Sequence, residues 1–276
     1  MIEKILLADS GTGHTEEMLK ALMEVPAIKP ASVSVLHVVP PQVVADEMTA
    51  KWEEGGKFLA TAIQNLQLDP THVRGMLRQG DPKTTVCEVA DEIEADLIIM
   101  GSRGLKRLES ILENSVSQYV FQLSKRPMLL VKDDIYVKKI NKIMVAVDGS
   151  EGAKECLKLA LFLLRDIKGG QLILAHVNAK GQETPAGVES VLKTGSDEAK
   201  KLGIAYKSVT GVGKSGEEIC RLAEENNVDL LMLGSPDRRP TIAKTLPDLD
   251  RLLGNSLSDY VRVHANCPVL LARTIG

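Results

Sequence analysis

The chain contains the segment Asp96-Leu97-Ile98-Ile99-Met100-Gly101-Ser102, which returns in its second half as Asp229-Leu230-Leu231-Met232-Leu233-Gly234-Ser235. Each copy has consecutive apolar residues that end at a glycine, without the alternation of a strand exposed on one face. Such a run is typical of a parallel strand covered by helices on both faces. The two copies therefore predict a buried strand near the middle of a sheet in each half of the chain.

Three more segments of the first half return in the same order in the second half. They are Ile5-Leu6-Leu7-Ala8-Asp9 with Met144-Val145-Ala146-Val147-Asp148, Val35-Leu36-His37-Val38 with Leu174-Ala175-His176-Val177, and residues 114–120 with residues 255–261. A repeat this long exceeds the roughly 20 to 50 residues of solenoid units. At 276 residues the chain has room for two domains that each bury a core. We expect domains at residues 1–134 and 140–276, joined by a short charged linker.

Apolar runs of strand length alternate with segments of helical period, which predicts an α/β fold with a parallel sheet in each domain. The expected strands are residues 4–9, 32–39, 71–78, 96–101 and 127–131, and then 142–148, 171–177, 204–210, 229–234 and 268–272. The expected helices include residues 14–24, 46–66, 82–94, 114–124 and 216–226. The fold class is therefore two doubly wound α/β domains.

The composition narrows the classes of function. The net charge is −3 and aromatic residues make up 3% of the chain, so there is neither a basic field nor a set of rings for nucleic acid. No apolar run is long enough to span a bilayer and no signal peptide precedes the first strand, so we expect a cytoplasmic protein without membrane contact. Because the four cysteines lack metal-ligand spacing, we expect buried free thiols at Cys87, Cys156, Cys220 and Cys267.

A candidate ligand site follows from the strand ends. Asp9 ends the first strand and Gly101 ends the fourth, and ligands of open α/β sheets bind at the carboxyl ends of the strands. A lone aspartate there is also a common turn or cap residue, but its convergence with Gly101 favours a ligand role. After Gly101 come Gly104 and then Asn114-Ser115-Val116-Ser117, which opens a helix. Glycines let a backbone approach phosphate, and the amides of a helix start attract anions, although many helices simply begin with Asn or Ser.

Taken together, these residues resemble the universal stress protein family in its tandem form. In the first half the resemblance is carried by the strand that ends at Asp9, by His37-Val38-Val39-Pro40 and by residues 96–104, 114–120 and 126–131; in the second half it is carried by Val147-Asp148-Gly149-Ser150 and by residues 233–235, 254–258 and 267–271. It covers nearly the whole chain. It implies a five-stranded parallel sheet in the order 3-2-1-4-5 with two helices on each face. It also implies that the domains pair through residues 128–131 and 269–272, and a homodimer is a further assembly to test.

The resemblance also implies ATP, with or without magnesium, as the ligand in the branch of the family that has a glycine-rich motif. Carried over to the first half, the candidate binding residues are Asp9, Ser10, Val38, Val39, Met100, Gly101, Gly104, Asn114, Ser115, Val116 and Ser117. Asn114 replaces the motif's third glycine; it tolerates left-handed backbone and keeps its amide, yet its side chain could also intrude on the phosphates. The second-half candidates are Asp148, Gly149, Val177, Gly234, Asn255, Ser256 and Ser258. There the second glycine is missing, so we expect binding chiefly in the first domain.

Other motifs are weaker. Gly211-Val212-Gly213-Lys214-Ser215 imitates the end of a P-loop, but Ser208 stands where the full pattern has glycine. Gly11-Thr12-Gly13 imitates a dinucleotide-binding turn, but Glu16 occupies its third glycine position. We interpret His37 and His176 as core or edge histidines. Met48, Trp52 and Phe58 form either a partner-facing stripe or a core stripe, and we favour the core stripe.

Three functions remain open. The first is a stress-response protein that acts as a nucleotide-dependent switch or scaffold, with no catalytic residues. The second is a protein-interaction scaffold whose nucleotide site has decayed. The third is a slow ATP hydrolase, for which neither a base nor an arginine clamp is evident.

Overall fold

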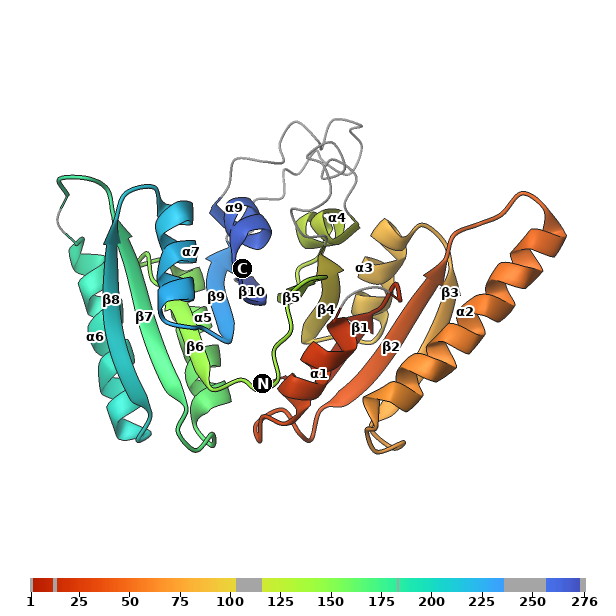
Figure 1. The fold of residues 1–276 in the computed structure, drawn as a ribbon, viewed down its shortest axis with the longest axis horizontal. Helices are drawn as coiled ribbons and strands as arrows, with labels where there is room; N and C mark the ends of the chain where they lie inside the picture. The colour runs from red at the N-terminus through yellow and green to blue at the C-terminus, as the bar shows by residue number, and fades with distance from the viewer. Residues whose placement is uncertain (1, 12–13, 103–115, 183, 236–256, 274–276) are drawn as a thin grey trace. The chain divides into compact units, whose positions relative to one another are not determined.

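The computed structural model describes residues 2–11, 14–102, 116–182, 184–235 and 257–273 (Figure 1). The described chain forms two compact units. The first consists of residues 1–24 and 28–138, and the second consists mainly of residues 139–276. None of the described helices combines the length and the hydropathy that crossing a lipid bilayer requires.

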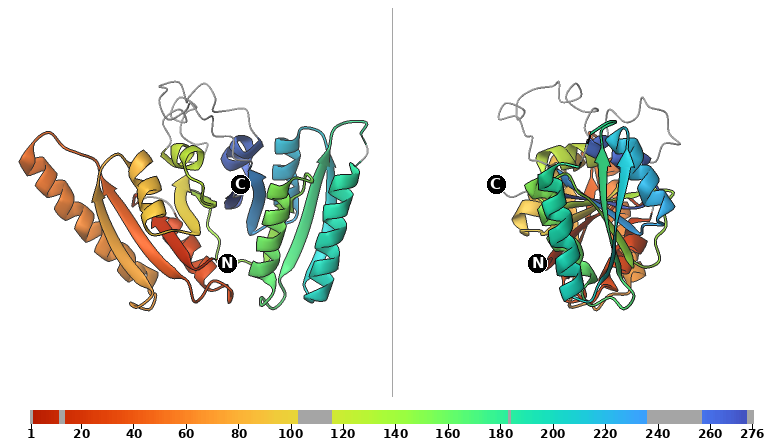
Figure 2. Two further views of the ribbon diagram at one scale, coloured as in Figure 1. Left: turned by 180° about the vertical axis from the view of Figure 1, so that it is seen from behind. Right: turned by 90° about the vertical axis from the view of Figure 1, so that its left-hand side faces the viewer.

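The first unit is a five-stranded sheet in the order β3-β2-β1-β4-β5, in which every neighbouring pair is parallel. This confirms the predicted strand order. Helices α1 and α2 lie next to each other on the sheet, and α3 and α4 form a second pair (Figures 1 and 2). The elements are β1 (Lys4–Ala8), α1 (Thr15–Met23), β2 (Ser32–Val39), α2 (Ala45–Leu66), β3 (Val73–Gln79), α3 (Pro82–Glu92), β4 (Leu97–Ser102), α4 (Val116–Leu123) and β5 (Met128–Lys132).

The second unit repeats this architecture with the strand order β8-β7-β6-β9-β10, again entirely parallel. Helix α5 packs beside α6, and α7 packs beside α9. The elements are β6 (Lys142–Ala146), α5 (Glu151–Leu164), β7 (Gln171–Asn178), α6 (Ala186–Lys201), β8 (Ala205–Val212), α7 (Ser215–Glu225), β9 (Leu230–Ser235), α9 (Leu257–His264) and β10 (Val269–Arg273).

The central strands form the core of each unit. Ile98 and Ile99 of β4, and Leu231 and Met232 of β9, are fully buried, as the continuous apolar runs predict. Local signals set the element ends: α3 begins at Pro82, and the Asp81 side chain accepts a hydrogen bond from the Lys83 amide at its start. Each sheet therefore presents rigid strand ends to the loops that follow them.

The hydrogen bonds at the end of the first strand of each sheet change the residue that corresponds to Asp9 in the second unit. The Asp9 amide donates to the Leu36 carbonyl, and the matching bond in the second unit runs from the Val147 amide to the Ala175 carbonyl. Asp9 therefore aligns with Val147, and the sequence match of Asp9 with Asp148 is wrong by one residue. Since successive side chains of an extended strand alternate in direction, Asp9 is buried whereas Asp148 is exposed.

Two packing expectations are also wrong in part. Cys156 and Cys267 are buried thiols as expected, but Cys87 and Cys220 are only half-buried. Trp52 is 41% exposed and so does not belong to a core stripe.

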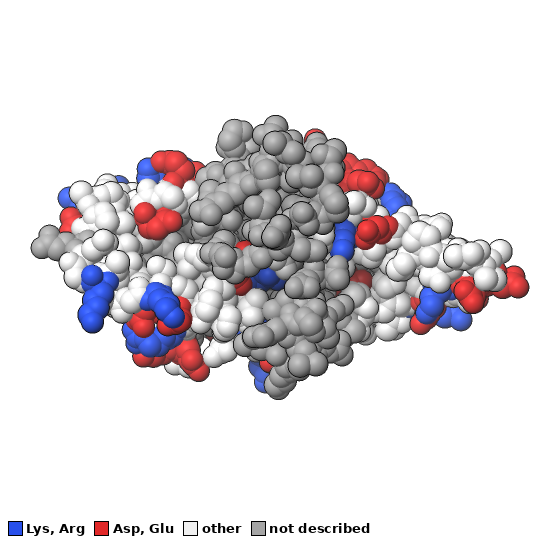
Figure 3. Space-filling model, turned by 90° about the horizontal axis from the view of Figure 1, so that it is seen from above, with Lys and Arg blue, Asp and Glu red and all other residues white. Residues whose placement is uncertain are grey.

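Surface charges are paired locally. On the face shown in Figure 3, the described acidic and basic side chains lie beside one another. Typical pairs are Lys51 with Glu54, whose Nζ and Oε2 are 2.7 Å apart, and Lys158 with Glu155. Exposed pairs of this kind contribute little to stability.

Candidate functional site

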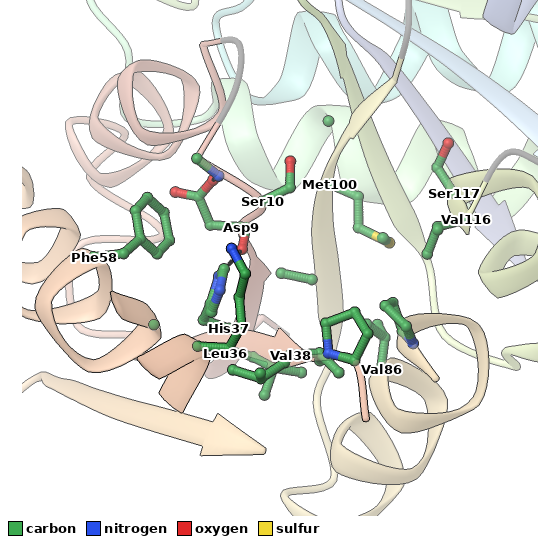
Figure 4. A pocket seen from close by; sticks show the side chains of 18 of the residues that line it. Asp9, Ser10, Leu36, His37, Val38, Phe58, Val86, Met100, Val116 and Ser117 are labelled. Atoms are coloured by element: carbon green, nitrogen blue, oxygen red, sulfur yellow. Dashed lines mark hydrogen bonds between the residues drawn. The ribbon is translucent and has the colours of Figure 1, made fainter. Parts of the chain in front are cut away.

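A cavity of about 780 Å³ opens at the carboxyl ends of β1, β2 and β4 (Figure 4). The topology brings these strand ends together because β1 pairs with both β2 and β4. Eight of the sequence-predicted residues line it: Asp9, Ser10, Val38, Val39, Met100, Gly101, Val116 and Ser117. Gly104, Asn114 and Ser115 lie outside the described residues. A volume of this size accommodates a ligand as large as a nucleotide.

Asp9 is the buried acidic residue of the cavity, and the residue as a whole is only 6% exposed. Its Oδ1 accepts a hydrogen bond from the Gly11 amide at 2.9 Å. Gly11 has a left-handed φ of +82°, and a Cβ there would lie 2.9 Å from Phe58 Cε2, so the turn requires glycine. The second oxygen, Oδ2, is buried without a hydrogen bond to any described residue. A buried acceptor left in this state is costly unless a ligand supplies a donor.

The electrostatics of Asp9 follow from this burial. Loss of solvent raises the pKa of the Asp9 carboxyl, and the Gly11 amide, the Thr15 side chain and, to a smaller extent, His37 and Glu16 offset only part of that effect. Burial and the charge of Asp9 together raise the pKa of Glu16, in the first turn of α1. A ligand hydroxyl or amine that donates to Oδ2 would favour the ionised carboxylate.

The opposite wall is apolar. Val38, Met100 and Val116 border the cavity together with Val86 of α3 (Figure 4). Such a surface suits a flat heterocycle, which gains from leaving water without needing a partner for every face. Gly101 and the buried Ser117 lie where β4 ends and α4 begins.

The sequence interpretation missed a third wall, which α2 supplies. The cavity is also lined by Lys51, Glu54, Gly55 and Phe58, together with His37, which by sequence alone is a core or edge residue. The ring centroids of Phe58 and His37 are 4.7 Å apart. The signal was present in the sequence, because these α2 positions follow the three- and four-residue spacing of one helical face.

The second unit arranges its predicted residues differently. Asp148 is exposed, and its Oδ1 accepts from the Ser150 amide at 3.0 Å. Gly149 has a φ of +78° and lies beside the backbone of Gly187 in α6, where a Cβ on Gly149 would approach Gly187 C to 3.4 Å. Val177 is in β7 and the buried Ser258 is in α9, whereas Asn255 and Ser256 lie outside the described residues.

Gly234, at the end of β9 in the second unit, packs against the start of helix α5. A Cβ on Gly234 would lie 2.3 Å from the backbone carbon of Gly152, in the first turn of α5. Gly234 and Gly152 therefore pack the start of α5 closely against the end of β9.

The loop that imitates a P-loop carries an acid. A Cβ on Gly211 would lie 2.8 Å from Glu218 Oε2, and Glu218 pairs with Arg221. A carboxylate in this position repels phosphate. The geometry agrees with the sequence interpretation that this loop is not a P-loop.

These observations define the class of the protein: a tandem of two doubly wound α/β domains, of which the first has a ligand-sized cavity at the carboxyl edge of its sheet. The family model described as "Universal stress protein family" matches residues 1–132 and 139–273. The chain belongs to the universal stress protein family, with two copies of the family's domain.

Several named proteins and solved structures are similar to this chain. Universal stress protein YxiE of Bacillus subtilis is 27% identical over 148 residues, which cover 48% of this chain and all of that protein. A universal stress protein structure from Archaeoglobus fulgidus covers 98% of this chain and 96% of its own, with 24% identity and a TM-score of 0.76. A single-domain universal stress protein solved in complex with cAMP covers 48% of this chain and 95% of its own, with 24% identity and a TM-score of 0.36.

Proposed function

We propose that the first domain binds ATP or a related adenine nucleotide, and that the protein acts in the cytoplasm as a nucleotide-dependent switch or scaffold in the stress response. The observation that carries the proposal is the cavity itself. It combines an apolar wall with a buried carboxylate oxygen, Asp9 Oδ2, that lacks a donor among the described residues. An adenine nucleotide offers a flat apolar base and several hydroxyl and amine donors.

The chemistry of the lining suggests how the nucleotide lies. The adenine would occupy the wall formed by Val38, Val39 and Met100, and the ribose would lie at Asp9. The phosphates would extend over Gly101 toward Ser117, near the start of α4, where backbone amides favour anions. Within the described part of the chain, no group of three or more His, Cys, Asp or Glu side chains could hold a metal. Any magnesium that accompanies the nucleotide would be held mainly by the phosphates and water, as is usual for this ion.

Two observations argue against an equivalent ligand site in the second domain. Its Asp148 is exposed, and the start of α5 packs closely on the end of β9 at Gly152 and Gly234. We propose that this domain contributes to interaction and assembly more than to ligand binding.

Isothermal titration of the full chain with ATP, with and without magnesium, tests the proposal. We expect saturable heat and a thermal shift from the wild type. Gly104→Val should weaken binding at least about tenfold by crowding the phosphate path, whereas Asn114→Gly should bind equally or more tightly. Absence of both heat and thermal shift at millimolar nucleotide would leave the interaction scaffold as the function. Loss of binding in Asn114→Gly would contradict the role given to that position.

A further inference from the structure

His37 lines the cavity beside Glu54, and one of its ring nitrogens has no hydrogen bond to a described residue. Its Nδ1 lies 3.0 Å from the Asp9 carbonyl oxygen. Because a carbonyl oxygen can only accept, Nδ1 carries the hydrogen, and the lone pair of the neutral ring is therefore on Nε2. No described residue forms a hydrogen bond with Nε2, although the half-buried ring lines the cavity.

The ring is held in one orientation. Phe58 packs against it, and the absence of a side chain at Gly55 makes room for it, since a Cβ there would lie 3.1 Å from His37 Cδ2. Together with the bond to Asp9, these contacts fix both the tautomer and the plane of the imidazole. A fixed acceptor of this kind recognises a ligand better than a mobile one.

The second unit provides an internal comparison. His176 occupies the position of His37, and its Nδ1 likewise bonds a main-chain oxygen, that of Val147, at 2.6 Å. Its Nε2, however, lies 2.8 Å from the Asn178 Oδ1 position, and the other end of that amide contacts the Thr184 hydroxyl. With the hydrogen on Nδ1, the Asn178 amide turns its NH2 group toward Nε2 and its oxygen toward the Thr184 hydroxyl. The position of Asn178 corresponds to Val39 in the first unit, which offers no polar side chain. The same histidine is thus satisfied internally in one half and left open beside a cavity in the other.

We propose that His37 is a specificity-determining residue of the first-domain site, whose Nε2 accepts a hydrogen bond from the ligand. This inference rests on the proposed nucleotide binding. The donor is an O–H or N–H group. The ring is bonded to the main chain of Asp9, where the ribose is placed, so the donor is a ribose hydroxyl. Asp9 Oδ2 and His37 Nε2 then form a pair of acceptors, which selects a ligand with donors at neighbouring positions.

The test uses two histidine variants of the full chain. In His37→Asn the side-chain amide can still donate to the Asp9 carbonyl, as Nδ1 does, but the Nε2 acceptor is lost. In His37→Gln the longer side chain can reach the Nε2 position but loses the Asp9 bond. We expect His37→Asn to bind ATP about three- to tenfold more weakly than wild type, which corresponds to one neutral hydrogen bond, and His37→Gln to recover part of the loss. The matched control, His176→Asn, should leave ATP affinity unchanged.

Ligand analogues identify the donor. Titrations use ATP, 2′-deoxy-ATP, 3′-deoxy-ATP and ITP, which lacks the adenine amine, against wild type and His37→Asn. We expect one deoxy analogue to bind wild type more weakly than ATP does, and this difference to vanish in His37→Asn. If instead the difference in affinity between ATP and ITP is present in wild type and vanishes in His37→Asn, the ribose assignment is wrong and the adenine amine is the donor to His37.

Two failures are distinguishable. Wild type that binds none of these nucleotides refutes the proposed function, and this inference with it. Wild type that binds ATP while His37→Asn keeps both the same affinity and the same preferences among the analogues refutes only the role of His37. Melting temperatures of both variants show whether they fold. If His37→Asn does not fold, titrations of wild type and His37→Gln with the two deoxy analogues still test whether His37 accepts from a ribose hydroxyl.

Discussion

At the scale of the residue, the two halves differ by the position of one carboxylate. Asp9 occupies the strand-end position that holds Val147 in the second unit, and Asp148 aligns with Ser10. An apolar side chain in that position is satisfied by burial alone, whereas a carboxylate needs donors. Of the two carboxylate oxygens of Asp9, Oδ1 accepts from the Gly11 amide, whereas Oδ2 has no hydrogen-bond donor among the described residues. The first domain thus holds a destabilising group that a ligand can satisfy.

This burial predicts a pH-dependent stability. Because the folded-state pKa of Asp9 is raised, its contribution to stability is fully present below the unfolded value of about 3.9 and is lost as the pH rises through the higher folded value. Asparagine cannot ionise and can still accept from Gly11. We therefore expect Asp9→Asn to have a larger free energy of unfolding than wild type at pH 7, with the difference shrinking toward pH 4.

Urea denaturation of the ligand-free protein at both pH values measures this difference. Asp148→Asn is the control, and it should change stability less because that carboxylate is exposed. Equal stability of Asp9→Asn and wild type at every pH would mean that the Asp9 carboxylate is not desolvated. Glu16 adds to the same trend. Its pKa is raised by burial and by the charge of Asp9, so removal of that charge in Asp9→Asn makes the ionised form of Glu16 less unfavourable at pH 7.

At the scale of the element, the helix that follows the first strand of each sheet is placed differently in the two units. Helix α5 begins at Glu151, directly after the Ser150 cap, whereas α1 begins at Thr15. The early start brings Gly152 onto the end of β9, where a Cβ on it would lie 3.0 Å from the Gly234 Cα. Two glycines facing each other are what allow this helix start and this strand end to touch.

Gly234→Ala should therefore destabilise the protein. The added Cβ would lie 2.3 Å from the Gly152 carbon and 2.6 Å from the Ala153 nitrogen, and backbone atoms cannot move aside as a flexible side chain can. We expect a loss of about 1 to 3 kcal/mol in the free energy of unfolding, as for other overpacked sites.

The control for this prediction is Gly187→Ala, in the first turn of α6. A Cβ there has no atom within 4 Å, and alanine lowers the backbone entropy of the unfolded chain, so a gain of roughly 0.5 to 1 kcal/mol is expected. Chemical denaturation of both variants decides. Gly234→Ala as stable as wild type would show that α5 and β9 are further apart than the structure has them.

At the scale of the whole molecule, duplication gave one chain two sheets of the same order and two strand edges of different chemistry. The first has a cavity with a buried carboxylate and an open histidine nitrogen. The second has an exposed aspartate and a histidine bonded within the chain. We infer a division of roles, with one domain for the ligand and the other for assembly.

This division predicts the stoichiometry of binding. Titration of the full chain with ATP should give one nucleotide per chain, not two. Asp9→Asn should weaken that binding about tenfold or more, because a charge-assisted hydrogen bond is lost, whereas Asp148→Asn should leave it unchanged. Two equivalent sites, or equal effects of the two substitutions, would contradict the division.

The sequence alone determined the duplication, the α/β class and the first-domain strand ends. Continuous apolar runs, turn glycines and helical periods are local signals that burial on both faces of a sheet enforces. Eight predicted residues meet in one cavity for the same reason, since parallel strands end at a common edge. Only the tertiary structure decided the register that aligns Asp9 with Val147, the wall supplied by α2, and the contrast between His37 and His176. These features depend on which atoms of distant segments meet across the sheet. A one-residue shift in strand register, or the packing of one helix start on a strand end, changes them without altering the hydrophobic periodicity of the sequence.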